Sequence, residues 1–222
     1  MQYRKLQDNV SARNNYNKSF YNSTSFVYDL FLDTILLPLI TGAGTRRHYQ
    51  TISSMISDIH GIEILDLACG TGSIVQYLAD DVSYTGLDLA EKMIFLAKKR
   101  IKQTHISKYR FIVESAHNMP FYDQEFDVVI CNLALHFFPD YRQVISEVGR
   151  VLKKDGSFIA CLPVKGRNKY YDIIWQRLSR RSFRWGIPLY ERDIKESCEV
   201  SGFSYKHIAS NGSIIYFEAR KQ

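Results

Sequence analysis

The decisive stretch of this sequence is Ile62-Glu63-Ile64-Leu65-Asp66-Leu67-Ala68-Cys69-Gly70-Thr71-Gly72. Its apolar residues predict a strand that is buried on both faces and that runs directly into a Gly-x-Gly turn. The apolar spacing that follows predicts a helix over residues 73–80. A strand, a glycine turn and a helix in this order are typical of the nucleotide-binding start of a doubly wound α/β sheet.

The residues around this turn narrow the choice of ligand. Val75 stands where the dinucleotide fingerprint requires its third glycine, and the sequence has no Gly-x-x-x-x-Gly-Lys-Ser/Thr phosphate loop. The carboxylate of Asp66 would repel a pyrophosphate and would suit a cationic ligand. A second carboxylate, Asp88, ends the next predicted strand, where it can accept hydrogen bonds from both ribose hydroxyls. A nucleoside with a positively charged tail fits both features, and S-adenosylmethionine is such a ligand.

With these residues the chain resembles the class I S-adenosylmethionine-dependent methyltransferases, and among them the type 11 enzymes and those of ubiquinone and menaquinone biosynthesis. The resemblance covers about residues 62–221. Beyond the glycine turn it rests on four segments, which resemble the family's second motif, its adenine-side motif, its fourth strand and the helix and turn before its fifth strand. In that order they are Leu87–Met93, Glu114–Phe121, Phe126–Asn132 and Val148–Ser157.

The resemblance implies that S-adenosylmethionine is the cofactor and S-adenosylhomocysteine the product. At position 115 many family members carry an acid that accepts a hydrogen bond from the adenine amino group, whereas a serine hydroxyl accepts more weakly. Asn132 follows the fourth strand and is expected near the methionine portion. The expected cofactor-binding residues are Asp66, Ala68, Gly70, Gly72, Asp88, Leu89, Met93, Ser115, Ala116 and Asn132.

The alternation of strands and helices predicts an α/β fold, Rossmann-like and doubly wound, with a mostly parallel seven-stranded sheet. The expected strands are 62–67, 83–88, 109–113, 126–131, 157–163, 203–209 and 213–219, and the expected helices are 73–80, 90–103, 140–152, 170–181 and 190–201. Asn211-Gly212 between two alternating segments predicts a hairpin, so the strand at Ile214–Ala219 should run antiparallel to its neighbours.

Two domains of unequal size are expected. Residues 1–60 should form a helical N-terminal extension that covers the acceptor side, and residues 61–222 the methyltransferase domain. Within the extension, Met1–Ser19 is polar and is expected to be loose. The apolar spacing of Phe20–Ile59, broken at Pro38 and at the glycines near residue 42, predicts two or three helices.

Acceptor specificity is expected from two segments outside the cofactor motifs. Tyr21 and Tyr28 of the N-terminal segment, and Tyr171 and Trp175 of the insert at 165–192, are the predicted substrate-binding residues. His136, just past the fourth strand, is the candidate general base, because a histidine can take a proton near neutral pH. The alternative for His136 is a histidine that packs and hydrogen-bonds locally.

Composition limits the remaining possibilities. The formal net charge is +6, and the four cysteines form no C-x-x-C pair, so we expect reduced thiols in a cytoplasmic protein and no metal site. Residues 1–10 are polar and charged and do not resemble a signal peptide. The amphipathic, basic insert could rest on an anionic membrane surface, cap an apolar substrate, or pack on the sheet with a solvated basic face.

Three functions from different classes remain open at this point. The first is methyl transfer to a small, lipophilic or aromatic acceptor that resembles a quinone, a lipid or a natural product. The second is methylation of RNA or protein, which the sequence pI of about 9.0 permits. Against it, no nucleic-acid module is appended, and Cys131-Asn132-Leu133-Ala134 stands in place of the Asn/Asp-Pro-Pro-Tyr/Phe motif. The third is a non-catalytic protein that only holds the cofactor.

Overall fold

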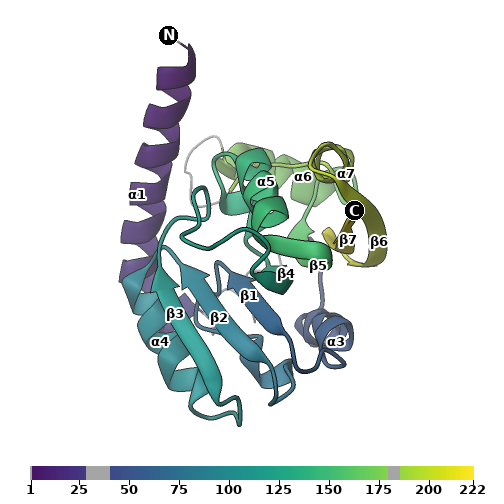
Figure 1. Cartoon of the computed structure of the whole chain (residues 1–222). Helices are drawn as coiled ribbons and strands as arrows, with labels where there is room; N and C mark the ends of the chain where they lie inside the picture. Colours follow the sequence, from purple (N-terminus) through teal and green to yellow (C-terminus); the bar gives the residue numbers. More distant parts are fainter. Residues whose placement is uncertain (1, 29–40, 180–185) are drawn as a thin grey trace.

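The computed structural model describes residues 2–28, 41–179 and 186–222, with the side chains of the first range described over 10–23 (Figure 1). A seven-stranded sheet has the order β3-β2-β1-β4-β5-β7-β6. β1 to β5 run parallel, whereas β7 is antiparallel to both β5 and β6, which confirms the predicted fold class. The strands are β1 (Glu63–Leu67), β2 (Ser83–Asp88), β3 (Lys108–Val113), β4 (Phe126–Asn132), β5 (Leu152–Pro163), β6 (Phe203–Asn211) and β7 (Ile214–Lys221).

Helices cover both faces of the sheet. One face packs against α5 (Tyr141–Val151) and α7 (Glu191–Val200), and the other against α3 (Thr45–Ile56), α4 (Glu91–Ile101) and the short 3-10 helix η2 (Val75–Tyr77). The remaining elements are α1 (Gln2–Tyr28), α6 (Lys169–Ser179) and the 3-10 helix η3 (Leu135–Phe137). Within the described residues, no helix is both long and apolar enough to cross a membrane.

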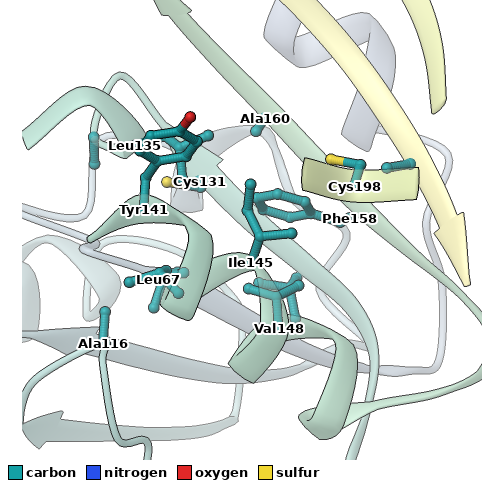
Figure 2. Close-up of a cluster of buried hydrophobic side chains, with 14 of the residues drawn as sticks. Leu67, Ala116, Cys131, Leu135, Tyr141, Ile145, Val148, Phe158, Ala160 and Cys198 are labelled. Atoms are coloured by element: carbon teal, nitrogen blue, oxygen red, sulfur yellow. The ribbon is translucent and has the colours of Figure 1, made fainter. Parts of the chain in front are cut away.

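The core beneath α5 shows how the sequence pattern produces the packing. Val144, Ile145 and Val148 recur at helical spacing and are fully buried, and the Asp140 carboxylate caps the helix by accepting from the Gln143 amide at 3.1 Å. Figure 2 shows Ile145 and Val148 beside Phe158 of β5 in this core. Burying each of these aliphatic side chains contributes about 1.5–3 kcal/mol.

The helix predicted over residues 73–80 is wrong, because only the 3-10 turn η2 forms there. The amides of Val75, Tyr77 and Leu78 each donate to the carbonyl three residues earlier, and Leu78 is already extended at φ −84° and ψ 151°. Ile74, Val75 and Leu78 are nevertheless buried. Tight turns therefore bury the same apolar side chains that a helix would, so periodicity alone could not separate the two structures.

The expectation that Met1–Ser19 is loose is also wrong, because α1 is helical from Gln2 to Tyr28. Its described contacts with α4 are polar: Lys18 pairs with Glu91 at 2.9 Å, and Asn22 accepts from the Lys92 amide at 3.0 Å. Figure 1 shows α1 alongside α4. Polar contacts of this kind leave no apolar pattern in residues 1–19 from which the helix could have been predicted. The helices expected in Phe20–Ile59 include the end of α1 and all of α3, while residues 29–40 lie outside the described chain.

The predicted β6–β7 hairpin forms, with its two-residue loop one position later than expected. Asn211 pairs with Ile214 across the hairpin, so the loop is Gly212-Ser213. The Asn211 carboxamide accepts from the Gly44 amide at 3.1 Å and donates to the Gly44 carbonyl at 2.9 Å. The Ser213 amide donates to the Thr41 carbonyl at 2.9 Å. The hairpin turn therefore holds the segment that leads into α3.

Replacing Gly212 with alanine should destabilise the fold by about 2–4 kcal/mol. Gly212 has φ +57°, and an added Cβ would lie 2.4 Å from the Thr41 carbonyl oxygen and 2.6 Å from the Gly42 carbonyl carbon. Gly202→Ala is the matched control, because Gly202 also has positive φ (+83°) but a Cβ there meets nothing within 4 Å. Urea unfolding of both variants measures the difference, and equal losses of stability would show that the contact with residues 41–42 does not matter.

Candidate active site

The predicted cofactor residues follow four neighbouring parallel strands, β3, β2, β1 and β4. Parallel strands end at the same edge of a sheet, and in open α/β folds ligands bind outside that carboxyl edge. The structure thus brings together Asp66–Gly72 after β1, Asp88–Met93 after β2, Ser115–Ala116 after β3 and Asn132 at the end of β4. In Figure 1 the arrowheads of β1, β2 and β3 all point toward this edge.

In the turn after β1, every second residue has a left-handed backbone conformation: φ is 54° at Ala68, 54° at Gly70 and 74° at Gly72. The two glycines differ in what surrounds them. A Cβ on Gly72 would lie 3.3 Å from the Ala97 Cβ, so this glycine lets the turn pack closely against α4. A Cβ on Gly70 would meet nothing within 4 Å. The backbone at Gly70 is therefore open to a ligand, as a cofactor-binding turn requires.

Asp88 ties the glycine turn to the end of β2. Its Oδ2 accepts from the Gly70 amide at 2.9 Å and its Oδ1 from the Ala90 amide at 2.8 Å. Burial raises the pKa of Asp88 to about 6, and the bonds from these backbone amides oppose that shift. The Leu89 amide acts in the same sense, and a carboxylate has about four lone-pair positions, so Asp88 keeps capacity to accept from a ribose hydroxyl. This geometry fits the predicted ribose-binding role.

Asp66 lies deeper, at the end of β1, and is almost completely buried. The Tyr84 hydroxyl donates to its Oδ2 at 2.7 Å. Burial raises the pKa of Asp66 to about 7, the Tyr84 bond opposes the shift, and the charge of Asp88 adds to it. No ion pair to Asp66 occurs within the described chain. A buried carboxylate of this kind fits a cationic ligand, and the pair Asp66 and Asp88 therefore fits S-adenosylmethionine, which carries a ribose and a positively charged end.

The adenine side is built around Ser115. Its hydroxyl accepts from the His117 amide at 3.3 Å and from the Asn14 side chain of α1 at 3.4 Å. His117 is buried, and burial lowers its pKa. The other predicted residues of this side differ in exposure: Met93 and Ala116 are buried and Leu89 is partly buried. Contact of these residues with the cofactor stays a prediction.

Asn132, at the end of β4, lies in a polar cluster between the sheet and α3. Its Oδ1 accepts from the Cys161 thiol at 3.0 Å. His48 of α3 is buried nearby and shares a 2.8 Å hydrogen bond with the Tyr216 hydroxyl. Burial lowers the pKa of His48 to about 4, and the Asn132 side chain partly offsets the shift. His48 was not among the predicted site residues, and its helical spacing with the buried Ile52 and Ile56 is the signal that could have found it.

On the acceptor side, α1 approaches the loop after β4. Asn17 donates to the Phe137 carbonyl at 3.3 Å, and the Tyr21 ring meets the Phe137 ring edge-on at 6.0 Å. A pocket of about 140 Å³ lies beside this contact. It is formed by α1, η3, the end of α6 and the segment after it, and its lining residues are Arg13, Asn17, Phe137, Ser179, Gly186, Ile187 and Pro188. None of these residues was predicted individually, although Ser179, Gly186, Ile187 and Pro188 belong to the insert at 165–192 that was expected on the acceptor side.

The predicted catalytic and acceptor residues that the structure describes are not among those that line that pocket. His136 is buried against Trp175, with ring centres 5.8 Å apart, and Trp175 lies 4.7 Å from Tyr171. Burial lowers the pKa of His136 to about 3, so the neutral imidazole is a weak base. Its catalytic role, and substrate contact by Tyr171, Trp175 and Tyr21, stay predictions. The side chain of Tyr28 lies outside the described residues.

Comparison with known proteins shows which family has this sheet and this glycine turn. A family model described as "Methyltransferase domain" matches residues 59–209, which is more than half of the chain. The chain belongs to this methyltransferase family. The solved structure of the YcgJ protein from Bacillus subtilis superposes with a TM-score of 0.68 at 18% identity, covering 80% of this chain and 99% of that one. That likeness shows the Rossmann-like fold.

Curated relatives of the methyltransferase are similar over part of their length. Demethylmenaquinone methyltransferase of Thermotoga maritima is 38% identical over 113 residues, which cover 50% of this chain and 47% of the relative. Phthiotriol/phenolphthiotriol dimycocerosates methyltransferase of Mycobacterium tuberculosis is 39% identical over 104 residues, covering 46% and 37%. The matched segments thus span about half the length of these relatives or less.

Proposed function

We propose that this protein transfers the methyl group of S-adenosylmethionine to a small, lipophilic or aromatic acceptor. The observation that carries the proposal is the pocket beside Phe137, which lies in the loop after β4, one of the four strands whose carboxyl ends carry the predicted cofactor residues. Its volume of about 140 Å³ is close to that of a cavity that holds one benzene ring. Two relatives whose names mention a quinone and a lipid-like dimycocerosate support this class of acceptor.

The walls of the pocket suit an aromatic ring that carries oxygen substituents. Arg13 and Asn17 bring a guanidinium and a carboxamide from α1, whereas Phe137, Ile187 and Pro188 provide apolar contact. A phenol or quinol ring could pack on the apolar side and direct its oxygens toward α1. Burying one such ring contributes on the order of 2–3 kcal/mol.

The chemistry demands little of the protein beyond positioning. The sulfonium of the cofactor supplies an activated methyl group and a good leaving group. In the proposed site, Asp88 holds the ribose, Asp66 faces the cationic end, and the pocket aligns the acceptor atom and excludes water. A hydroxyl or carbon acceptor loses one proton, and an acidic phenol can lose it to solvent before transfer. A strong protein base is therefore not required, which agrees with the weak basicity of His136.

The direct test is transfer of labelled methyl groups. The protein is incubated with methyl-labelled S-adenosylmethionine and, separately, with quinol and phenol lipids, small phenols, total RNA and unfolded protein. Label is expected in the fraction that partitions into organic solvent. Label in RNA or protein would instead support the second function class, and tight cofactor binding without any transfer would support a protein that only holds the cofactor.

Filling the pocket should block the acceptor and spare the cofactor. Ile187→Trp places an indole where the half-buried Ile187 lines the pocket, so kcat/KM for the acceptor should fall at least about tenfold, or about 1.4 kcal/mol. Affinity for S-adenosylhomocysteine should stay within about twofold. Val200→Trp is the matched control, because Val200 is 84% exposed at the end of α7. Undiminished turnover by Ile187→Trp would show that the acceptor binds elsewhere.

A further inference from the structure

The outward side of α6 exposes three large apolar side chains in a row. Tyr170, Ile173 and Ile174 are 82%, 51% and 44% exposed, and their spacing places them on one face of the helix. We call these three residues the α6 outer face. The opposite side of α6 carries Tyr171 and Trp175, both buried. Among the described residues, Tyr171 and Trp175 provide the inward packing of α6, and the α6 outer face does not belong to the buried core.

The structure separates the apolar residues of α6. Trp175 packs against His136 and Tyr171 against Trp175, whereas Ile173 and Ile174 are exposed. α6 is therefore apolar on two sides. A surface helix of a globular protein normally needs only one apolar side.

Cations surround the α6 outer face. Lys169 and Arg177 are exposed, and their spacing to Tyr170, Ile173 and Ile174 places them at its two ends. Near the start of α6, Tyr190 is also partly exposed and lies between Lys165 and Arg192, whose cationic groups are 5.2 and 4.8 Å from its ring. The one acidic residue within α6 is Asp172, whose carboxylate accepts from the Gly166 amide at 2.9 Å.

We propose that the α6 outer face docks onto an anionic lipid bilayer. Tyr170, Ile173 and Ile174 would enter the boundary between headgroups and acyl chains, and Lys169 and Arg177 would meet anionic headgroups. Apolar side chains rimmed by cations are the chemistry that binds such surfaces. The formal net charge of +6 adds long-range attraction to the same membrane.

Two observations favour a bilayer over a second copy of the chain. The α6 outer face consists of three side chains on a helix of 11 residues, whereas a stable protein interface buries about 800 Å² on each partner. A two-fold dimer would also bring Lys169 and Arg177 of one copy toward the same cations of the other, because such an interface pairs a patch with itself. An anionic lipid surface requires no minimum interface of that size, and it attracts Lys169 and Arg177 instead of repelling them.

The position of α6 relates this docking to the pocket beside Phe137. Ser179, the last residue of α6, lines the pocket beside Phe137, and so do Gly186 and Ile187 just beyond it. A protein seated on the α6 outer face would hold that pocket close to the bilayer, where lipophilic molecules are concentrated. The docking itself does not depend on which acceptor is methylated, so the two proposals can fail separately.

Vesicle co-sedimentation tests the docking. The full-length protein should sediment with vesicles of equimolar phosphatidylglycerol and phosphatidylcholine, at least about tenfold more than with phosphatidylcholine alone, and the binding should weaken with added salt. The double variant Ile173→Glu/Ile174→Glu should bind at least about tenfold more weakly. Lys169→Glu should weaken binding to the vesicles that contain phosphatidylglycerol and should leave binding to pure phosphatidylcholine vesicles unchanged. Val200→Glu, which changes a side chain 84% exposed on α7, should bind like the unaltered protein.

Thermal melting and affinity for S-adenosylhomocysteine confirm that each variant is folded. The proposal is overturned if the unaltered protein ignores anionic vesicles, or if Val200→Glu loses binding as much as the double variant does. It is also overturned if size-exclusion chromatography shows a dimer that the double variant converts to a monomer, since the occupant would then be a second copy. Methyl transfer in detergent without vesicle binding would reject the docking and leave the proposed function intact.

Discussion

Replacing Asp88 with alanine should weaken the binding of S-adenosylhomocysteine by about 2–4 kcal/mol, or roughly 30- to 1,000-fold in Kd. In the proposed site the variant would remove the acceptor of the ribose hydroxyls, and it also leaves the amides of Gly70 and Ala90 without the carboxylate that now accepts from them. Calorimetric titration measures the change. Asp58→Ala, at an exposed position after α3, is the control for loss of one negative charge.

A ligand that lacks one ribose hydroxyl separates the two causes. If Asp88 binds the ribose, the 2′-deoxy ligand should bind the unaltered protein more weakly but should lose little further in Asp88→Ala, because the shared bond is already gone. If the loss of affinity from the 2′-deoxy ligand and the loss from Asp88→Ala add, Asp88 does not contact that hydroxyl and supports binding only by holding the Gly70 turn. A folded variant with unchanged affinity for the full ligand would falsify the ribose assignment altogether.

Replacing Asp66 with asparagine should stabilise the cofactor-free protein at pH 8. Burial raises the pKa of Asp66 to about 7, from an ordinary value near 4. Stability from a carboxyl with a raised pKa is fully present below pH 4 and is lost as the pH rises through 7. A shift of about three pH units corresponds to roughly 4 kcal/mol, which sets the upper limit of the gain at pH 8. Asparagine keeps an oxygen that can accept from Tyr84 but carries no charge to bury.

Urea unfolding at pH 4 and pH 8 tests this expectation, with Asp58→Asn as an exposed control. The gain should be large at pH 8 and close to zero at pH 4, where the native carboxyl is also neutral. Binding of S-adenosylmethionine at pH 8 should weaken in the same variant, because its cationic end loses a carboxylate. If Asp66→Asn is less stable than the unaltered protein at pH 8, the carboxylate already has a compensating partner.

The parts of this protein that the sequence predicted correctly share one property: the information lies within a short segment. The buried run before Asp66, the strand that ends at Asp88 and the Asn-Gly signal at the terminal hairpin could each be recognised locally, and together they define the sheet. The structure then places both carboxylates at one edge, where Asp88 accepts from the Gly70 amide and Asp66 from the Tyr84 hydroxyl.

The acceptor side could not be predicted in the same way. The pocket joins Arg13 and Asn17 to Phe137 and Ile187, residues that are far apart in the chain and that only tertiary packing brings together. α1 contacts the domain largely through asparagine and lysine side chains, with the Tyr21 ring against Phe137, and such a mixed contact leaves no clear apolar pattern in the sequence. His136 looked like a base by its position after β4, but the burial that makes it a weak one depends on Trp175 and on the close approach of Gly186.

The order of strands has a consequence for the growing polypeptide. β7 comes last in chain order, yet it lies inside the sheet, between β5 and β6. Until β7 leaves the ribosome, the backbone of β5 is an unpaired edge open to other chains. The residues that hold segment 41–48 are also synthesised late. Asn211 and Ser213 hydrogen-bond to residues 41–44, and Tyr216 hydrogen-bonds to His48. Completion of the sheet and docking of α3 are therefore expected as one late event after most of the protein has been synthesised.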